Sequence, residues 1–153
     1  MSNFQEHLDE LARKFDCKIT FDRNQWLWMP KKYKDDPTGA AYSNSICIYR
    51  WRDNCVKCYF AGLHELGHFH FQTNGDNDKY RKNVIHHECE AWEWAINNSE
   101  IELTEEMIEY MKSCLSSYIK DRFYFNFGKI TSFADSFLKK FNLDWEYEAD
   151  YRM

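Results

Sequence analysis

The fold is decided by the stretch Phe60-Ala-Gly-Leu-His64-Glu65-Leu-Gly-His68-Phe-His-Phe71. Its leucines are good helix formers and no proline interrupts the run, so we predict a helix from about Cys58 to Phe71. Helical residues four apart lie about 40° from each other around the axis, so the imidazoles of His64 and His68 can reach one ion. The spacing His-Glu-x-x-His therefore predicts a zinc site in which Glu65 acts as general base.

The surroundings of this motif strengthen the zinc prediction. Apolar residues flank it closely on both sides, which predicts a buried helix. A buried Glu65 between two histidines would be costly without a partner such as a metal. The alternative is a helix with two ordinary histidines and an ordinary glutamate. We expect one zinc ion per chain.

Composition and charge restrict the class of protein. The chain has 153 residues, 44% of them hydrophobic and 18% aromatic, which is typical of one folded domain. We expect a single domain, with a catalytic core at 1–97, helices at 98–143 and an acidic tail at 144–153. The net charge of -5, without a basic run, argues against direct nucleic-acid binding and against an anionic membrane as partner.

The compartment follows from the N-terminus and the cysteines. Residues 1–15 lack the apolar segment of a signal peptide, and no stretch is long enough to cross a membrane. We therefore expect a cytoplasmic protein whose six cysteines are reduced. The pair Cys55-Val-Lys-Cys58 is interpreted chiefly as packing thiols, with a redox role or a second metal site as the alternatives.

The hydrophobic pattern predicts a small sheet in front of the zinc helix. A first amphipathic helix is expected at residues 4–15. Strands are expected at Cys17–Phe21, Trp26–Met29 and Ser45–Trp51, with an exposed loop at Pro30–Gly39. The sequence thus predicts an α+β fold with about three strands packed on the zinc helix.

The third zinc ligand is expected on a downstream helix, at about Lys82 to Asn97. Glu88 lies on its more apolar stripe, whereas Glu90 is about 200° away around the axis. A carboxylate that points into a core needs a cation, so we predict a His₂Glu site completed by Glu88. Glu90 is the next candidate.

Three further histidines are less suitable as ligands. His86 and His87 are expected on the surface or behind the ligands, because two adjacent side chains cannot both face one metal. His70 lies about 200° around the helix from His68 and cannot join the same ion.

The order of these motifs resembles the ImmA/IrrE family of zinc metallopeptidases. The resemblance rests on the zinc helix and on Glu88-x-Glu90-Ala91-x-x-Trp94-Ala95, and it covers about residues 4–97. Trp92 stands where that family usually has Asn or Asp. The family's Leu-Leu-Met-Pro segment is replaced here by Ile96-Asn-Asn-Ser-Glu.

The resemblance implies a zincin fold of gluzincin type and a zinc metalloendopeptidase. His64 and His68 would be ligands, with Glu65 as general base and Glu88 as third ligand. The substrate would be a specific intracellular protein, often a transcriptional repressor. The alternative is a non-catalytic binding module on a zincin scaffold: an inhibitor, an antirepressor or a component of a toxin system.

The last third of the chain is expected to be helical. Thr104 is predicted to cap one helix, and Thr131 or Ser132 another. An extended substrate is expected to pair with an edge strand just before the zinc helix. The residues predicted for that edge are Ser45, Ile46, Cys47, Ile48 and Tyr49.

Overall fold

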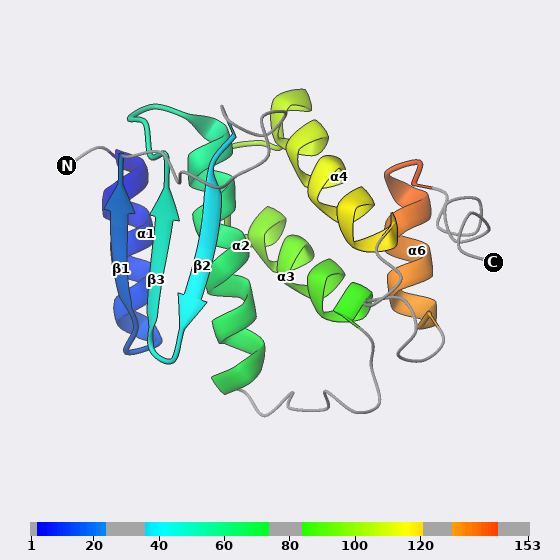
Figure 1. The fold of residues 1–153 in the computed structure, drawn as a ribbon, viewed down its shortest axis with the longest axis horizontal. Helices are drawn as coiled ribbons and strands as arrows, with labels where there is room; N and C mark the ends of the chain where they lie inside the picture. The colour runs from blue at the N-terminus through cyan, green and yellow to red at the C-terminus, as the bar shows by residue number, and fades with distance from the viewer. Residues whose placement is uncertain (1–2, 24–35, 74–83, 121–129, 144–153) are drawn as a thin grey trace.

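The computed structural model describes residues 3–23, 36–73, 84–120 and 130–143, and its helices and strands confirm the α+β class (Figure 1). The helices are α1 (Asn3–Lys14), α2 (Val56–Thr73), α3 (Val84–Asn98), α4 (Glu105–Lys120) and α6 (Ser132–Lys140). The strands are β1 (Lys18–Asp22), β2 (Thr38–Tyr42) and β3 (Ser45–Tyr49). Within these ranges, no helix is both long and apolar enough to cross a membrane.

The three strands form a mixed sheet in the order β1-β3-β2. β3 runs parallel to β1 and antiparallel to β2. Ile19 pairs with Ile46 across the parallel ladder, and both are buried together with Ile48. Figure 1 shows α1 and α2 behind the sheet, so this apolar face is covered by helices.

The position of β3 corrects the prediction of the substrate edge. Ser45–Tyr49 lies in the middle of the sheet, with its backbone bonded to β1 on one side and β2 on the other. It therefore has no free edge for a peptide. The described sheet instead has β2 at the end beside α2.

The sequence predicted no strand at β2: Thr38 and Gly39 fall in the predicted loop at Pro30–Gly39, and the next predicted strand begins only at Ser45. A tight turn folds Thr38–Tyr42 back onto β3, with Ser43 in the left-handed region at a φ of 50°. Pairing along the hairpin thus forms a strand although its three central residues, Gly39, Ala40 and Ala41, have little strand preference of their own. The predicted strand Trp26–Met29 and the acidic tail at 144–153 lie outside the described residues.

The close approach of α2 and α3 depends on Gly67. A Cβ atom on this residue would lie 2.7 Å from the carbonyl oxygen of Ala91. Only glycine lets the two backbones come this near. Glu88 lies one helical turn before Ala91, so this contact brings Glu88 within reach of the α2 histidines.

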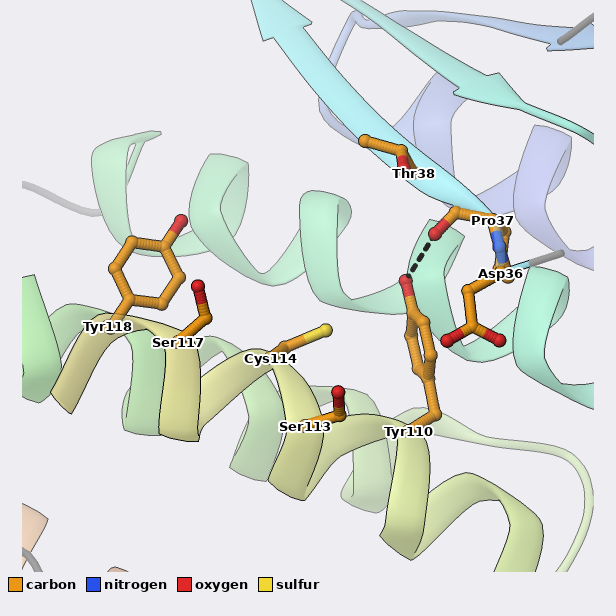
Figure 2. Close-up of a pocket in the computed structure, with 8 residues that line it drawn as sticks. All are labelled: Asp36, Pro37, Thr38, Tyr110, Ser113, Cys114, Ser117 and Tyr118. Atoms are coloured by element: carbon orange, nitrogen blue, oxygen red, sulfur yellow. Dashed lines mark hydrogen bonds between the residues drawn. The ribbon is translucent and has the colours of Figure 1, made fainter. Parts of the chain in front are cut away.

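The C-terminal helices begin at caps and are tied to the rest of the chain. Thr104 accepts a hydrogen bond from the amide of Met107 at 3.1 Å, and Thr131 accepts one from Ala134 at 3.2 Å, so both predicted caps are confirmed. The hydroxyl of Tyr110 donates to the carbonyl of Pro37 at 2.9 Å (Figure 2). This bond joins α4 to the start of β2.

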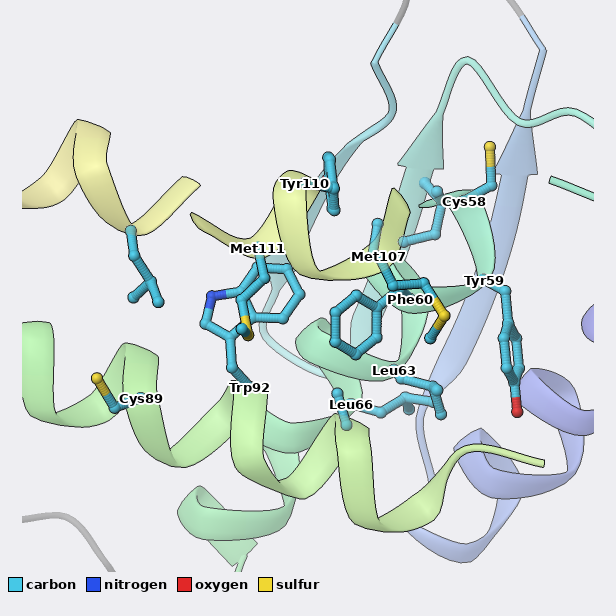
Figure 3. Close-up of a cluster of buried hydrophobic side chains, with 14 of the residues drawn as sticks. Cys58, Tyr59, Phe60, Leu63, Leu66, Cys89, Trp92, Met107, Tyr110 and Met111 are labelled. Carbon is cyan, nitrogen blue, oxygen red and sulfur yellow. The ribbon is translucent and has the colours of Figure 1, made fainter. Parts of the chain in front are cut away.

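The core lies where α2, α3 and α4 meet (Figure 3). Trp92 is 1% exposed and packs against Phe60, with 4.9 Å between the ring centroids. Tyr110 meets the same indole edge-on at 5.9 Å. Fully buried neighbours include Leu63, Leu66, Met107 and Met111. His64 of α2 contacts this core through Trp92.

Gly67→Ala is expected to destabilise the fold by about 1–3 kcal/mol, although alanine is the better helix former. The new methyl group would meet backbone, which gives way only if α3 moves. Gly62→Ala is the matched control on the same helix, because its Cβ would meet only the side chain of Leu8, which can change rotamer. Urea unfolding compares the two variants, and equal losses would contradict this account of Gly67.

Candidate metal centre

Two histidines of α2 and one glutamate of α3 meet in the described structure. His64 and His68 are one turn apart on the same face of α2, as predicted, and their ring centroids lie 4.6 Å apart. The Nε2 atom of His64 is 2.7 Å from Oε2 of Glu88, and the Nε2 atom of His68 is 3.3 Å from Oε1. Both imidazoles thus point their outer nitrogens at one carboxylate.

This group fits a metal ion. One donor atom from each of the three residues lies within 4.8 Å of the others. Ligands at 2.0–2.1 Å from a tetrahedral zinc ion are about 3.4 Å apart, so small side-chain movements suffice to surround an ion. Two histidines and one glutamate are also a known donor set of catalytic zinc, with the fourth position left for water.

The opposite charges of His64 and Glu88 stabilise each other. Burial disfavours the charged forms of His64 and Glu88, yet the attraction between them prevails. The Glu88 carboxylate raises the pKa of His64 above its usual value, with Glu65 assisting. The two histidines in turn lower the pKa of Glu88. Glu88 is therefore a buried carboxylate that keeps its negative charge, as a metal ligand must.

Trp92 supports His64 by stacking. Its ring lies nearly parallel to the imidazole, with 3.9 Å between centroids and 13° between planes. An Asn or Asp at this position would orient a ligand through a hydrogen bond, whereas the indole fixes the imidazole plane by contact. The same residue belongs to the buried core, so His64 stands on a rigid surface.

Glu65 lies between the histidines and β2. Its Oε1 atom is 3.6 Å from Nδ1 of His64, and its side chain is 14% exposed. A Cβ on Gly39 would lie 2.5 Å from Cγ of Glu65, so β2 passes directly over this glutamate. The predicted general base is thus held beside the metal centre, under the end strand of the sheet.

A cavity of about 200 Å³ lies between the start of β2 and α4, and it is not lined by the four residues of the centre (Figure 2). Its walls are the start of β2 and one face of α4, and they consist of Asp36, Pro37, Thr38, Tyr110, Ser113, Cys114, Ser117 and Tyr118. Burial, Cys114 and the charge of Glu65 raise the pKa of Tyr110 well above its usual range. Burial and the charge of Glu88 raise the pKa of Cys114 to about 12. Both groups of the cavity wall therefore stay protonated, chiefly because they are buried.

The other histidines lie away from the centre. His86 is 6% exposed, so the first of its two predicted places, the surface, is wrong; its Nδ1 atom bonds the hydroxyl of Thr131 at 2.6 Å. Glu90 lies 3.3 Å from His86 and 3.4 Å from His87. Glu90 is thus engaged within α3, whereas Glu88 turns toward α2. His70 packs against Phe15 and Trp94, outside the group.

Two residues of the site were missed from the sequence. Gly39 was placed in a loop, although a glycine beside small residues is a known signal of close backbone approach. Tyr110 lies on the same stripe of α4 as Met107 and Met111, but a tyrosine on an apolar face is usual and carries no sign of its partner. Neither residue could be linked to Glu65 without the packing of β2 and α4.

The apparent affinity for zinc is expected to rise about tenfold per pH unit from about pH 6.5 to 8. A histidine ligand must lose its proton, and Glu88 keeps that proton on His64 above the ordinary pKa of about 6.5. Two ordinary histidines would instead reach a plateau above about pH 7.5. Competition with a chromophoric chelator measures the slope, and a flat curve above pH 7 would contradict the expectation.

Comparisons with known proteins add no relative. No protein-family model matches the chain, and no curated protein or solved structure is significantly similar to it. The resemblance to the ImmA/IrrE family therefore stays a prediction. The function must be inferred from the residues of the centre and from the β2 and α4 residues around it.

Proposed function

We propose that this protein is a zinc-dependent metallopeptidase with a zincin-like fold. The observation that carries the proposal is the buried group of His64, His68 and Glu88, with Glu65 beside it under β2. One histidine would suffice as an ion-pair partner of the buried Glu88, so two histidines from one helical turn aimed at it favour a shared metal ion. A purely structural metal site would have no need of a second glutamate beside its histidines.

The chemistry divides between the ion and the chain. When bound, zinc supplies a Lewis acid for the scissile carbonyl and lowers the pKa of a water molecule. Glu65 accepts the proton of the attacking water and delivers it to the leaving amine. Gly39 leaves room for the Glu65 side chain, and Trp92 keeps the plane of His64 fixed. Histidine and carboxylate ligands thus stay in place while one proton moves.

β2 and the cavity beside it provide a binding place for a peptide substrate. An extended peptide can pair with an end strand of a sheet, and in the described sheet β2 occupies that position next to Glu65. A side chain of the peptide would then enter the cavity between β2 and α4. We propose a protein substrate inside the cell, with a transcriptional repressor as the class that the ImmA/IrrE resemblance suggests.

Metal analysis and cleavage together test this function. The wild-type chain, purified without chelators, is expected to hold about one zinc ion by elemental mass spectrometry. It should cleave at least one member of a peptide library or a repressor panel, lose this activity with a chelator and regain it with added zinc. A folded chain without zinc would overturn the proposal. Zinc without any cleavage would favour the non-catalytic binding module.

Gly39→Ala is expected to slow cleavage about 10- to 100-fold while the zinc content stays unchanged. The added methyl group would meet Cγ and Oε1 of Glu65 and displace the carboxylate from its position. Ala40→Ser is the matched control, because neighbouring residues of a strand point to opposite faces. Turnover of a verified substrate measures the effect. An unchanged kcat in a folded Gly39→Ala chain would contradict the role given to β2.

A further inference from the structure

Two cysteines lie at the N-terminus of α2, away from the candidate metal centre. Cys55 directly precedes α2 and serves as its cap, because the amide of Cys58 donates to Sγ of Cys55 at 3.4 Å. The backbone carbonyl of Cys55 also accepts the amide of Tyr59 at 3.1 Å. One helical turn therefore brings the first thiol against the residue that carries the second.

The first thiol is stabilised as a thiolate. Arg52 directs its guanidinium at Sγ of Cys55, with 3.5 Å between the atoms, and the first turn of α2 carries no acidic residue. Hydrogen bonds from Cys58, together with the charge of Arg52, outweigh burial and lower the pKa of Cys55 below its usual range. By contrast, burial raises the pKa of the partly exposed Cys47. Cys55 thus differs from an ordinary surface cysteine.

The second thiol is buried and held by the loop before the helix. Cys58 is 0% exposed, and its Sγ atom lies 3.5 Å from the carbonyl oxygen of Arg50. Arg50 and Asn54 both adopt left-handed backbone, with φ of 59° and 60°. Left-handed backbone is costly for arginine, so packing must hold the Arg50 carbonyl in this place. A partly exposed first thiol and a buried second one form the arrangement of a reactive dithiol.

We propose that Cys55 and Cys58 form a redox-active dithiol that is oxidised by low-molecular-weight disulfides. The Cys55 thiolate attacks one sulfur of the external disulfide, whose S–S bond breaks and releases one thiolate. Cys58 then loses its proton to solvent and attacks Sγ of Cys55, which releases the second thiolate. Both leaving thiolates take up protons. Two protein thiols are oxidised to one disulfide, and one external disulfide is reduced to two thiols.

The experiment uses the full chain and glutathione buffers. After incubation at fixed ratios of oxidised to reduced glutathione, free thiols are alkylated and peptides are mapped by mass spectrometry. We expect a reversible Cys55–Cys58 disulfide and no disulfide at the other four cysteines. With limiting iodoacetamide at pH 6.5, Cys55 should react at least about tenfold faster than Cys47, which serves as the internal control.

Variants separate the two steps. Cys58→Ser should trap glutathione on Cys55 as a stable mixed disulfide, whereas Cys55→Ser should take up none at this site. Because Cys58 is buried, circular dichroism must first show that the Cys58→Ser chain is folded. The disulfide mapping of the wild-type chain tests the proposal even if this variant does not fold. A Cys55–Cys58 pair that stays reduced in oxidised glutathione, or a Cys55 that reacts no faster than Cys47, would overturn the proposal. Zinc content measured alongside keeps this outcome separate from the metallopeptidase proposal.

Discussion

Glu88→Ala is expected to weaken zinc binding by more than about 100-fold, since the loss of a group that only orients a ligand already costs 10- to 100-fold. Glu88 approaches both histidines with one carboxylate and keeps its charge although it is buried. Its removal leaves the two neutral histidine nitrogens as the only ligands of the group. A chain purified from zinc-containing medium should then carry little or no metal in elemental mass spectrometry.

Glu90→Ala is the matched control for this experiment. It removes the same group from the same helix two residues away, where the carboxylate contacts His86 and His87 instead. We expect this variant to keep its zinc. Circular dichroism of both chains shows whether they are folded. If Glu90→Ala lost the metal while Glu88→Ala kept it, the choice of ligand from the structure would be wrong.

The ligand group was predictable from the sequence because it depends on short-range geometry. The distance between His64 and His68 is fixed by the pitch of one helix. The choice of Glu88 over Glu90 needed only the apolar stripe of the next helix, and the structure indeed turns Glu88 toward the histidines. Helix periodicity was therefore sufficient to predict that these three residues meet.

The end strand was not predictable in the same way. Thr38–Tyr42 contains a glycine and two alanines, and its strand conformation comes from pairing with β3. Sheet topology decides which strand lies at the end of a sheet. The residues of β3 do not indicate that this strand lies in the middle. The prediction of β3 as the substrate edge failed for this reason.

Contacts between distant segments explain the remaining differences. His86 is buried because Thr131, 45 residues later, bonds its ring. Trp92 could be compared with Asn or Asp in sequence, but its stacking on His64 depends on the approach of α2 and α3 at Gly67. The polarity of a residue predicts burial only on average, and its partner decides the individual case.

Glu65→Gln is expected to lower the kcat of peptide cleavage about 10²- to 10⁴-fold and to leave the zinc content unchanged. Glutamine has nearly the same shape, so it fits the space under Gly39, but its amide cannot accept the proton of water. Glu65 is also not among the three residues that could hold an ion. The variant thus separates proton transfer from metal binding, which no ligand variant can do.

Glu93→Gln makes the same chemical change at an exposed position of α3 and should leave kcat unaltered. Each variant is assayed with a verified substrate and analysed for metal in the same preparation. Full activity of a zinc-loaded Glu65→Gln chain would remove the general base from the mechanism, since a glutamine there has no other means of taking the proton. Lost activity together with lost zinc would show instead that Glu65 maintains the site, and the proton acceptor would then have to be sought along the cavity wall.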